Sequence, residues 1–224
     1  MESADLKRLA AEKAASMVVD GMAVGLSTGS TADYATRWLA QNRKNLRCLA
    51  TSRQTETLAS ELGLTLMSPA TLGGLDILID GADECTKDGD MIKGGGGALL
   101  REKLVARRAK RRIYVMDPSK IVSTLGKFPL PVEVVTFGWE WAQEALAALG
   151  AGVTRRRAKG GGDYLTDNGN VILDCAFGTI PDPKILEKSI RNIPGIVETG
   201  LFLGIATDVI VGDTAGVQTY LKAS

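Results

Sequence analysis

The first half of the chain alternates segments in which apolar residues recur at helical spacing with short runs that are almost wholly apolar. Helical spacing appears at residues 6–18, 35–39 and 98–109, and Ser52 is a candidate N-cap for a further helix. The apolar runs that predict strands are Met22–Leu26, Leu46–Ala50, Leu75–Ile79 and Ile113–Met116. Strands that alternate with helices predict a parallel sheet covered by helices.

The pattern changes at Lys127–Val135, where Pro129 and Pro131 fix an extended segment suited to a crossing between domains. The next segments predict strand, helix, strand, strand, helix and strand, the split βαβ order: Val132–Thr136, Trp139–Leu149, Val153–Arg157, Asn170–Ala176, Pro183–Asn192 and Ile196–Leu201. Ala206–Val211 predicts a strand that rejoins the first sheet, followed by a short helical tail. We therefore expect an α/β protein with a parallel-sheet domain at residues 1–128 and 203–224 and a smaller α+β domain at residues 129–202.

Composition narrows the chemistry more than the fold. The 224 residues include 27 Lys and Arg against 26 Asp and Glu, and this formal net charge of +1 predicts no global attraction to nucleic acid or to an anionic membrane. The chain contains no histidine, which excludes Ser-His triads and His-containing metal sites. Acid–base chemistry is therefore left to Asp, Glu, Lys or Tyr.

The cysteines and the N-terminal segment indicate a compartment. Cys48, Cys85 and Cys175 are widely spaced and odd in number, which fits buried spectator residues in a reducing environment. Residues 1–20 mix acidic and basic side chains, unlike a secretory signal peptide. The most apolar stretch, Met17–Leu26, is far shorter than the ~20 residues of a membrane span. We expect a cytoplasmic protein.

Glycine is in excess, at 26 residues, and the first cluster lies in Gly25–Thr31, GLSTGST. This segment follows a predicted strand and opens a predicted helix, so its free N–H groups, its hydroxyls and the helix dipole make a candidate phosphate cradle. Its spacing is GxxxG without a following lysine, which fits neither a Walker loop nor a dinucleotide-binding turn. The alternative is a glycine-rich turn in which Ser30 or Thr31 caps the helix.

Three acids follow the predicted strand at residues 75–79: Asp80, Asp83 and Glu84, in the sequence DGADE. Such a cluster serves either as a set of divalent-metal ligands or as hydrogen-bond partners for a polyol, and mutual repulsion would raise the pKa of at least one carboxyl. The alternative is a solvated acidic turn.

The sharpest signal is Lys93–Lys103, KGGGGALLREK. Four consecutive glycines let the backbone approach a ligand closely, at an entropic cost that is unusual in a plain connector. Glu102 falls about one turn into the following helix, which makes it a candidate general base beside Lys93. Burial and nearby acids would raise its pKa while Lys93 and the helix start would lower it, and the sequence leaves the sign open. The alternative is a glutamate that only complements the helix dipole.

Two basic runs complete the candidate segments: Arg107–Arg112 and Arg155–Lys159. They lack interleaved aromatic residues and do not belong to a basic domain. We interpret both as solvated surface rather than as a nucleic-acid site.

Four of these segments together resemble type A ribose-5-phosphate isomerases in order and spacing: TGST at Thr28–Thr31, DGADE at Asp80–Glu84, KGGGGALLREK at Lys93–Lys103 and DPSK at Asp117–Lys120. The resemblance continues through GKFPLPVEV at Gly126–Val134, TDNGNVILD at Thr166–Asp174 and IPGIVETGLF at Ile193–Phe202, and so covers nearly the whole chain. The local peculiarities of this chain are RRRAKGGG at Arg155–Gly162 and the Leu203–Ile205 stretch.

The resemblance implies a Rossmann-like domain carrying a smaller ferredoxin-like domain, usually as a homodimer. It implies an enzyme of the pentose phosphate pathway that interconverts D-ribose 5-phosphate and D-ribulose 5-phosphate without metal or organic cofactor. Glu102 would transfer the proton, and Asp80, Asp83 and Lys93 complete the implied catalytic group. The residues implied to hold substrate are Thr28, Gly29, Ser30, Thr31, Asp80, Gly81, Ala82, Asp83, Lys93, Gly94, Gly95, Gly96 and Lys120. Such an isomerase must move a proton between adjacent carbons and steady an enediolate, tasks suited to one carboxylate, a lysine and oriented donors.

Two other functions remain open from the sequence. A coenzyme A transferase of related α/β architecture uses a glutamate as nucleophile, and Glu102 beside glycines is compatible with that role. A sugar-phosphate-sensing domain of a transcription regulator would bind the same ligand without turnover, although no helix-turn-helix segment is evident before the first glycine cluster.

Overall fold

The larger part of the protein is built on a six-stranded sheet. The computed structural model describes residues 2–221, and the strands of this sheet are β1 (Ala23–Leu26), β2 (Arg47–Ala50), β3 (Leu75–Asp80), β6 (Ala109–Met116), β12 (Asp208–Asp213) and β13 (Gly216–Leu221). They lie in the order β13-β12-β6-β3-β1-β2. Every neighbouring pair is parallel except β12 and β13, which are antiparallel. The predicted parallel sheet is therefore confirmed.

Helices α1 (Ser3–Ala15), α2 (Ala32–Asn42) and α3 (Arg53–Glu61) contribute to the core on one face of this sheet. Helices α4 (Pro69–Leu72) and α5 (Leu99–Arg108) contribute to the core on the other face, which a small second sheet also covers. The second half of strand β6, Ile113–Met116, is apolar at four successive positions. Ile113 and Val115 belong to the core that includes α1, whereas Tyr114 and Met116 belong to the core that includes α5. A parallel strand buried on both faces needs apolar residues at successive positions.

The smaller part has the split βαβ order that the sequence predicts. Its elements are β7 (Leu130–Val134), α6 (Trp139–Ala148), β8 (Gly152–Arg155), β9 (Val171–Ala176), α7 (Pro183–Arg191) and β10 (Ile196–Thr199). The strands form an antiparallel sheet in the order β10-β7-β9-β8. Val132 and Leu173 face a core shared with α6 and α7, while Ile172 points the other way and joins the core of the larger part.

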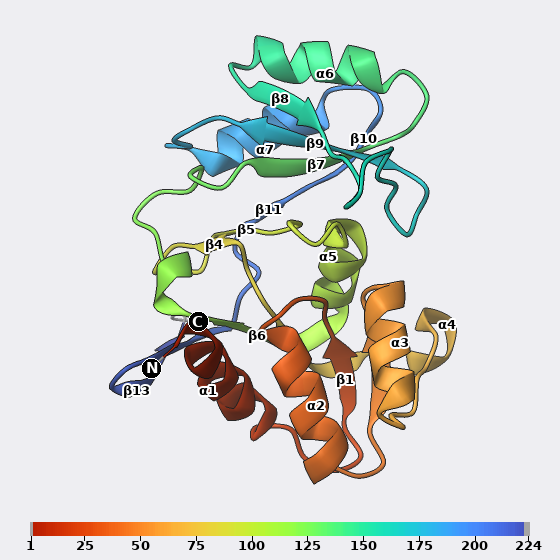
Figure 1. Cartoon of the computed structure of the whole chain (residues 1–224), viewed down its shortest axis with the longest axis vertical. Coiled ribbons are helices and arrows are strands. Elements are labelled where there is room, and N and C mark those ends of the chain that lie inside the picture. Colours follow the sequence, from red (N-terminus) through yellow and green to blue (C-terminus); the bar gives the residue numbers. More distant parts are fainter. Residues whose placement is uncertain (1, 222–224) are drawn as a thin grey trace.

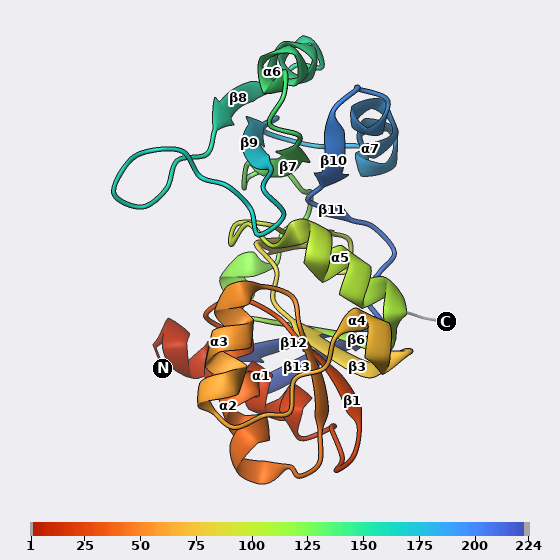
Figure 2. The ribbon, with the colours of Figure 1, turned by 90° about the vertical axis from the view of Figure 1, so that its right-hand side faces the viewer.

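A three-stranded antiparallel sheet connects the two parts, and in Figure 1 it lies between them. It consists of β4 (Glu84–Cys85), β5 (Met91–Ile92) and β11 (Leu201–Phe202) in the order β11-β5-β4. Figure 2 shows α5 between the small sheet and the large one, and α5 contacts β3, β6 and β10. The helix that carries Glu102 is thus packed from both sides.

The predicted helical tail is wrong. Residues 208–221 form a hairpin, in which β13 pairs with β12 as an edge strand. The side chain of Asp213 accepts a hydrogen bond from the Ala215 N–H at 2.7 Å and stabilises the turn. Val217 and Thr219 are β-branched residues that favour the strand once β12 offers a pairing edge. Residues 222–224 of the predicted tail lie outside the described residues. Within residues 2–221, no helix has the length and apolar character needed to cross a bilayer.

Candidate active site

The loops at the carboxyl ends of the parallel strands enclose an open polar cleft. Parallel sheets place ligands at this edge because the loops that leave neighbouring strands meet there. The cleft has room of about 140 Å³ for the centres of water molecules, and about 600 Å³ of empty space when the solvent at its mouth is included. Its lining residues are Lys7, Thr28, Gly29, Ser30, Thr31, Ala32, Gly81, Ala82, Asp83, Lys93, Gly94, Gly96, Glu102 and Lys120.

Lys93 and Glu102 form a buried charged pair in the floor of the cleft. The Lys93 Nζ lies 3.1 Å from the Glu102 Oε2 and 2.9 Å from the Asp80 Oδ1, and it donates a hydrogen bond to the Gly81 carbonyl oxygen at 2.7 Å. Glu102 stands in the first turn of α5, as the sequence predicts, and is 3% exposed. The hydroxyl of Ser27 faces the other carboxylate oxygen, Oε1, at 3.4 Å.

The structure settles the sign of the pKa change that the sequence leaves open. Burial raises the pKa of Glu102 to about 7, because removing the carboxylate from water outweighs the attraction of Lys93, and the negative charges of Asp80 and Asp83 add to the increase. Burial opposes the charge on Lys93, but the carboxylates of Asp80 and Glu102 keep the pKa of Lys93 above its usual value. Near neutral pH, Glu102 can therefore both accept and release a proton while Lys93 stays cationic.

Two aromatic rings that the sequence analysis does not identify surround the Lys93 ammonium. Its Nζ lies 5.3 Å from the ring centroid of Phe202 and 5.8 Å from that of Tyr114. Both rings are fully buried and exclude water on this side of the charge. Phe202 comes from β11, over a hundred residues away along the chain, so no local signal marks it as part of the site.

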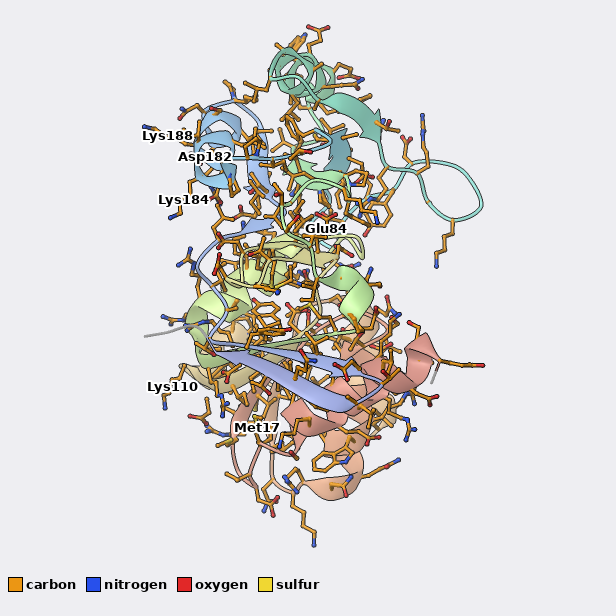
Figure 3. The ribbon with its side chains drawn as sticks, turned by 90° about the vertical axis from the view of Figure 1, so that its left-hand side faces the viewer. Met17, Glu84, Lys110, Asp182, Lys184 and Lys188 are labelled. Carbon is orange, nitrogen blue, oxygen red and sulfur yellow. The ribbon has the colours of Figure 1, made fainter. Side chains whose placement is uncertain are left out.

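The three acids of the DGADE segment have three different partners. Asp80 has no exposed surface and holds Lys93, so it does not make the predicted direct contact with the cleft. Asp83 lines the cleft and accepts a hydrogen bond from the Gly95 N–H at 2.7 Å. Glu84 is buried between the two parts of the molecule, where it accepts the N–H groups of residues 126 and 128 (Figure 3). The solvated-turn alternative is therefore wrong for Asp80 and Glu84.

The glycine-rich loop after β1 also lines the cleft, at the start of α2. The side chain of Thr31 occupies the N-cap position but makes no capping hydrogen bond, which removes the main support for a purely structural role. Lys7 of α1, missed by the sequence analysis, lies 3.4 Å from the Ser30 hydroxyl. Thr28 lines the cleft, but its hydroxyl lies 2.9 Å from the Thr55 Oγ1 and so has a hydrogen-bond partner on α3.

The glycines after Lys93 allow close approaches that a side chain would prevent. A Cβ atom on Gly95 would lie 2.6 Å from the Asp83 Oδ1, and one on Gly97 would lie 1.8 Å from the Tyr164 hydroxyl. Gly95 itself is not among the cleft-lining residues, and its contact is with Asp83. The glycine backbone therefore approaches Asp83 and Tyr164 of the protein itself, whereas the prediction was a close approach to a ligand. Gly94 and Gly96 do line the cleft.

The interpretation of both basic runs as solvated surface is wrong for several arginines. Arg111 pairs with Asp208 at 2.7 Å, and Arg112 donates to the Ile205 carbonyl at 2.6 Å, so both tie β6 to the C-terminal segment. The side chains of Arg155 and Arg156 are only 17% and 14% exposed. These groups serve tertiary contacts that sequence spacing does not reveal.

The three cysteines are buried, as expected. Burial raises the pKa of the thiols of Cys48, Cys85 and Cys175 to about 12, so all three remain protonated near neutral pH.

Residues 47–216 match the family model described as ribose 5-phosphate isomerase A (phosphoriboisomerase A). The chain belongs to this family. It is 48% identical to the ribose-5-phosphate isomerase A of Thermomicrobium roseum, over 95% of this chain and 92% of the relative. It is 43% identical to that of Bacillus mycoides, over 96% of this chain and 99% of the relative.

Solved structures agree with the isomerase family in fold. A D-ribose-5-phosphate isomerase in complex with phospho-erythronic acid superposes with a TM-score of 0.95 at 35% identity, covering 99% of this chain and 100% of that one. The ribose 5-phosphate isomerase A of Methanocaldococcus jannaschii gives a TM-score of 0.92 at 38% identity, with the same coverage of both chains. The predicted α/β class and the family resemblance are both confirmed.

Proposed function

We propose that this protein interconverts D-ribose 5-phosphate and D-ribulose 5-phosphate through an enediolate. The observation that carries the proposal is the buried Glu102 beside Lys93, with a pKa of about 7, in the floor of an open polar cleft. Membership of the isomerase family supports the choice of substrate and reaction. The catalytic group we assign is Glu102, Lys93 and Asp83, with Asp80 acting through Lys93.

Glu102 is suited to moving one proton in both directions. In the aldose it would remove the proton from C2, leaving an enediolate, and then return a proton to C1 to give the ketose. A base whose pKa lies near the working pH serves both half-reactions, because it is a strong enough acceptor in the first and donor in the second. The Lys93 ammonium, fixed by Asp80 and Gly81, places a positive charge where the enediolate oxygens become negative.

The two ends of the cleft fit the two ends of a sugar phosphate. At one end, the loop of Gly29, Ser30 and Thr31 meets the start of α2, and Lys7 and Lys120 supply positive charge for a phosphate dianion. At the other end lie Gly81, Ala82, Asp83, Gly94 and Gly96, which offer backbone groups and one carboxylate to the hydroxyls. We assign Thr28 and Gly95 to holding these loops in place, since their polar groups already have protein partners.

The organisation we propose follows the same reasoning. We propose a Rossmann-like domain at residues 1–128 and 203–224, of which residues 2–128 and 203–221 are described, and a ferredoxin-like domain at residues 129–202. Strand β11 lies within the second range but pairs with β5 of the first. We propose a cytoplasmic homodimer of the pentose phosphate pathway. Its partner is a small sugar phosphate and neither a nucleic acid nor a membrane, and it needs no metal or organic cofactor.

A coupled assay of ribose 5-phosphate turnover in EDTA tests the proposal. We expect full activity after exhaustive chelation, and loss of activity restored by Mg²⁺ or Mn²⁺ would instead make the acidic loop a metal site. With Glu102→Gln, kcat should fall by about 10²–10⁴ with a smaller change in KM, since the amide cannot accept the proton. Solvent deuterium should enter the reacting carbon with the wild-type protein and be almost absent from it with the variant.

The same preparation separates the rival functions. An acyl-CoA that leaves a covalent mass increase on the intact protein would indicate a transferase. Tight binding of ribose 5-phosphate without turnover would indicate a sensor. A Glu102→Gln variant within threefold of wild-type activity would assign the proton transfer to another group, and Asp83 would be the next residue to replace.

A further inference from the structure

The central arginine of the Arg155–Arg157 run joins the small sheet to the glycine loop. Arg156 follows β8, and its Nε donates a hydrogen bond to the Asp174 Oδ2 of β9 at 2.9 Å while its Nη2 pairs with the other carboxylate oxygen. The remaining nitrogen, Nη1, donates to the carbonyl oxygens of Gly94 at 2.7 Å and Gly95 at 3.1 Å. One guanidinium group, anchored on two sides, therefore holds two consecutive carbonyls of the loop.

Fixing these carbonyls also fixes the N–H groups that follow them. The peptide bonds of residues 2–221 are all trans, so each C=O and the next N–H point to opposite sides of the chain. With the Gly94 carbonyl turned to Arg156, the Gly95 N–H faces away, and it donates to the Asp83 Oδ2 at 2.7 Å. Asp83 is a cleft residue, and its carboxylate is thus held by a peptide that Arg156 orients.

The next peptide has a free donor. The Gly95 carbonyl is also turned to Arg156, so the Gly96 N–H points away from the arginine. Gly96 lines the cleft, and its N–H donates to no atom of residues 2–221. Tyr164 of the small domain also contacts this loop, because its ring packs against Gly97. The same ring lies 5.9 Å from the Arg156 guanidinium group.

We propose that Arg156 is a positioning residue for the isomerisation: it orients the Gly94–Gly96 peptides so that Asp83 is fixed and the Gly96 N–H points at a developing oxyanion of the substrate. This inference rests on the proposed function. A donor whose direction is set before the reaction needs no reorganisation when charge develops, and this is the main source of electrostatic catalysis. Arg156 is not among the residues that line the cleft, so in this proposal it acts through the loop.

The test compares Arg156→Met and Arg156→Lys with Arg157→Met. Arg157 is the matched control because it is the next residue, carries the same charge, is 64% exposed and pairs with Asp163 of its own loop. Losing one oxyanion donor typically costs about 10²–10³ in kcat, and a misdirected donor should cost about 10–10². We expect that loss for Arg156→Met, with KM within about threefold of the wild-type value. Arg156→Lys should recover only part of it, because an ammonium cannot reproduce the two-sided fork.

Inhibitor binding separates orientation from general destabilisation. In a 4-phosphoaldonate such as 4-phosphoerythronate the carboxylate carbon is separated from the phosphate by as many carbons as C2 of ribose 5-phosphate, so the carboxylate resembles the enediolate. Inorganic phosphate offers only the group that we assign to the Gly29–Thr31 loop. For Arg156→Met, the inhibition constant of the phosphoaldonate should rise by about the same factor as kcat falls, and that of phosphate should stay unchanged. A variant with a lower melting temperature but wild-type kcat and inhibition constants would overturn the proposal, since Arg156 would then only join the domains.

If Arg156→Met does not fold, Asp174→Asn decides the question. It keeps the shape of the anchor but removes its charge, and kcat should fall in the same direction by a smaller factor. An unchanged kcat for Asp174→Asn would overturn the proposal in that case. An inactive wild-type protein would refute the proposed isomerase function. An active wild type whose kcat does not change on replacement of Arg156 would refute only the role of Arg156.

Discussion

Glu102→Gln should make the protein more stable at neutral and alkaline pH while it removes activity. In the folded protein the pKa of Glu102 is raised from 4.5 to about 7, so folding favours the protonated carboxyl. The contribution of Glu102 to the wild-type free energy of unfolding is therefore highest below pH 4.5. Between pH 4.5 and about 7 the folded state holds a proton that the unfolded state has lost, so the free energy of unfolding falls as pH rises. Glutamine resembles the protonated form at every pH.

The structure sets the size of this effect. The difference between 4.5 and about 7 corresponds to about 3 kcal/mol of unfolding free energy at most. Glu102 is 3% exposed, so solvent does not screen the effect. The free energy of unfolding of Glu102→Gln minus that of the wild type should rise by a substantial part of this amount between pH 4.5 and about 8. Above that pH the difference should stay constant. Any constant offset from the substitution itself cancels in this comparison.

The assay is urea unfolding of both proteins at equal concentration across this pH range. Glu56→Gln, on an exposed position of α3, is the matched control and should show a far smaller pH dependence. A difference that does not change with pH, or that falls as pH rises, would refute the reasoning. It would mean that the attraction of Lys93 outweighs the cost of burying the carboxylate.

Two further outcomes follow from the same cleft. Thr31→Ala should raise KM for ribose 5-phosphate by about tenfold, through loss of a charge-assisted hydrogen bond to the phosphate, with the melting temperature almost unchanged because Thr31 makes no capping bond; an unchanged KM with a lower melting temperature would make Thr31 a structural cap. Asp83→Asn should lower kcat/KM and move the acidic limb of its pH profile to lower pH, because the Asp83 charge helps to raise the pKa of Glu102; a limb that stays in place or moves to higher pH would contradict this.

The sequence alone determined the order of the main helices and strands, without the short elements α4, β4 and β5, and the location of the main chemical groups along the chain. Buried parallel strands and amphipathic helices leave distinct local patterns, so the alternation of β1, α2, β2 and α3 and the split βαβ order were both readable. The four glycines and the glutamate in the first turn of the next helix are also neighbours in the sequence, so the sequence identified the start of α5 as a candidate site. The C-terminal strand β13 was missed because a short edge strand is defined by its partner β12.

Only the tertiary structure decided how those groups act on one another. The pKa of Glu102 depends on burial and on opposing charges within a few ångströms, and both are set by packing among β3, β5 and α5 rather than by spacing along the chain. Lys7, Phe202 and Arg156 reach the site or its loops from distant segments and carry no local signal of that role. Arg156 shows the limit most directly: a run of arginines reads as solvated surface until folding places Asp174 and two glycine carbonyls around its guanidinium group.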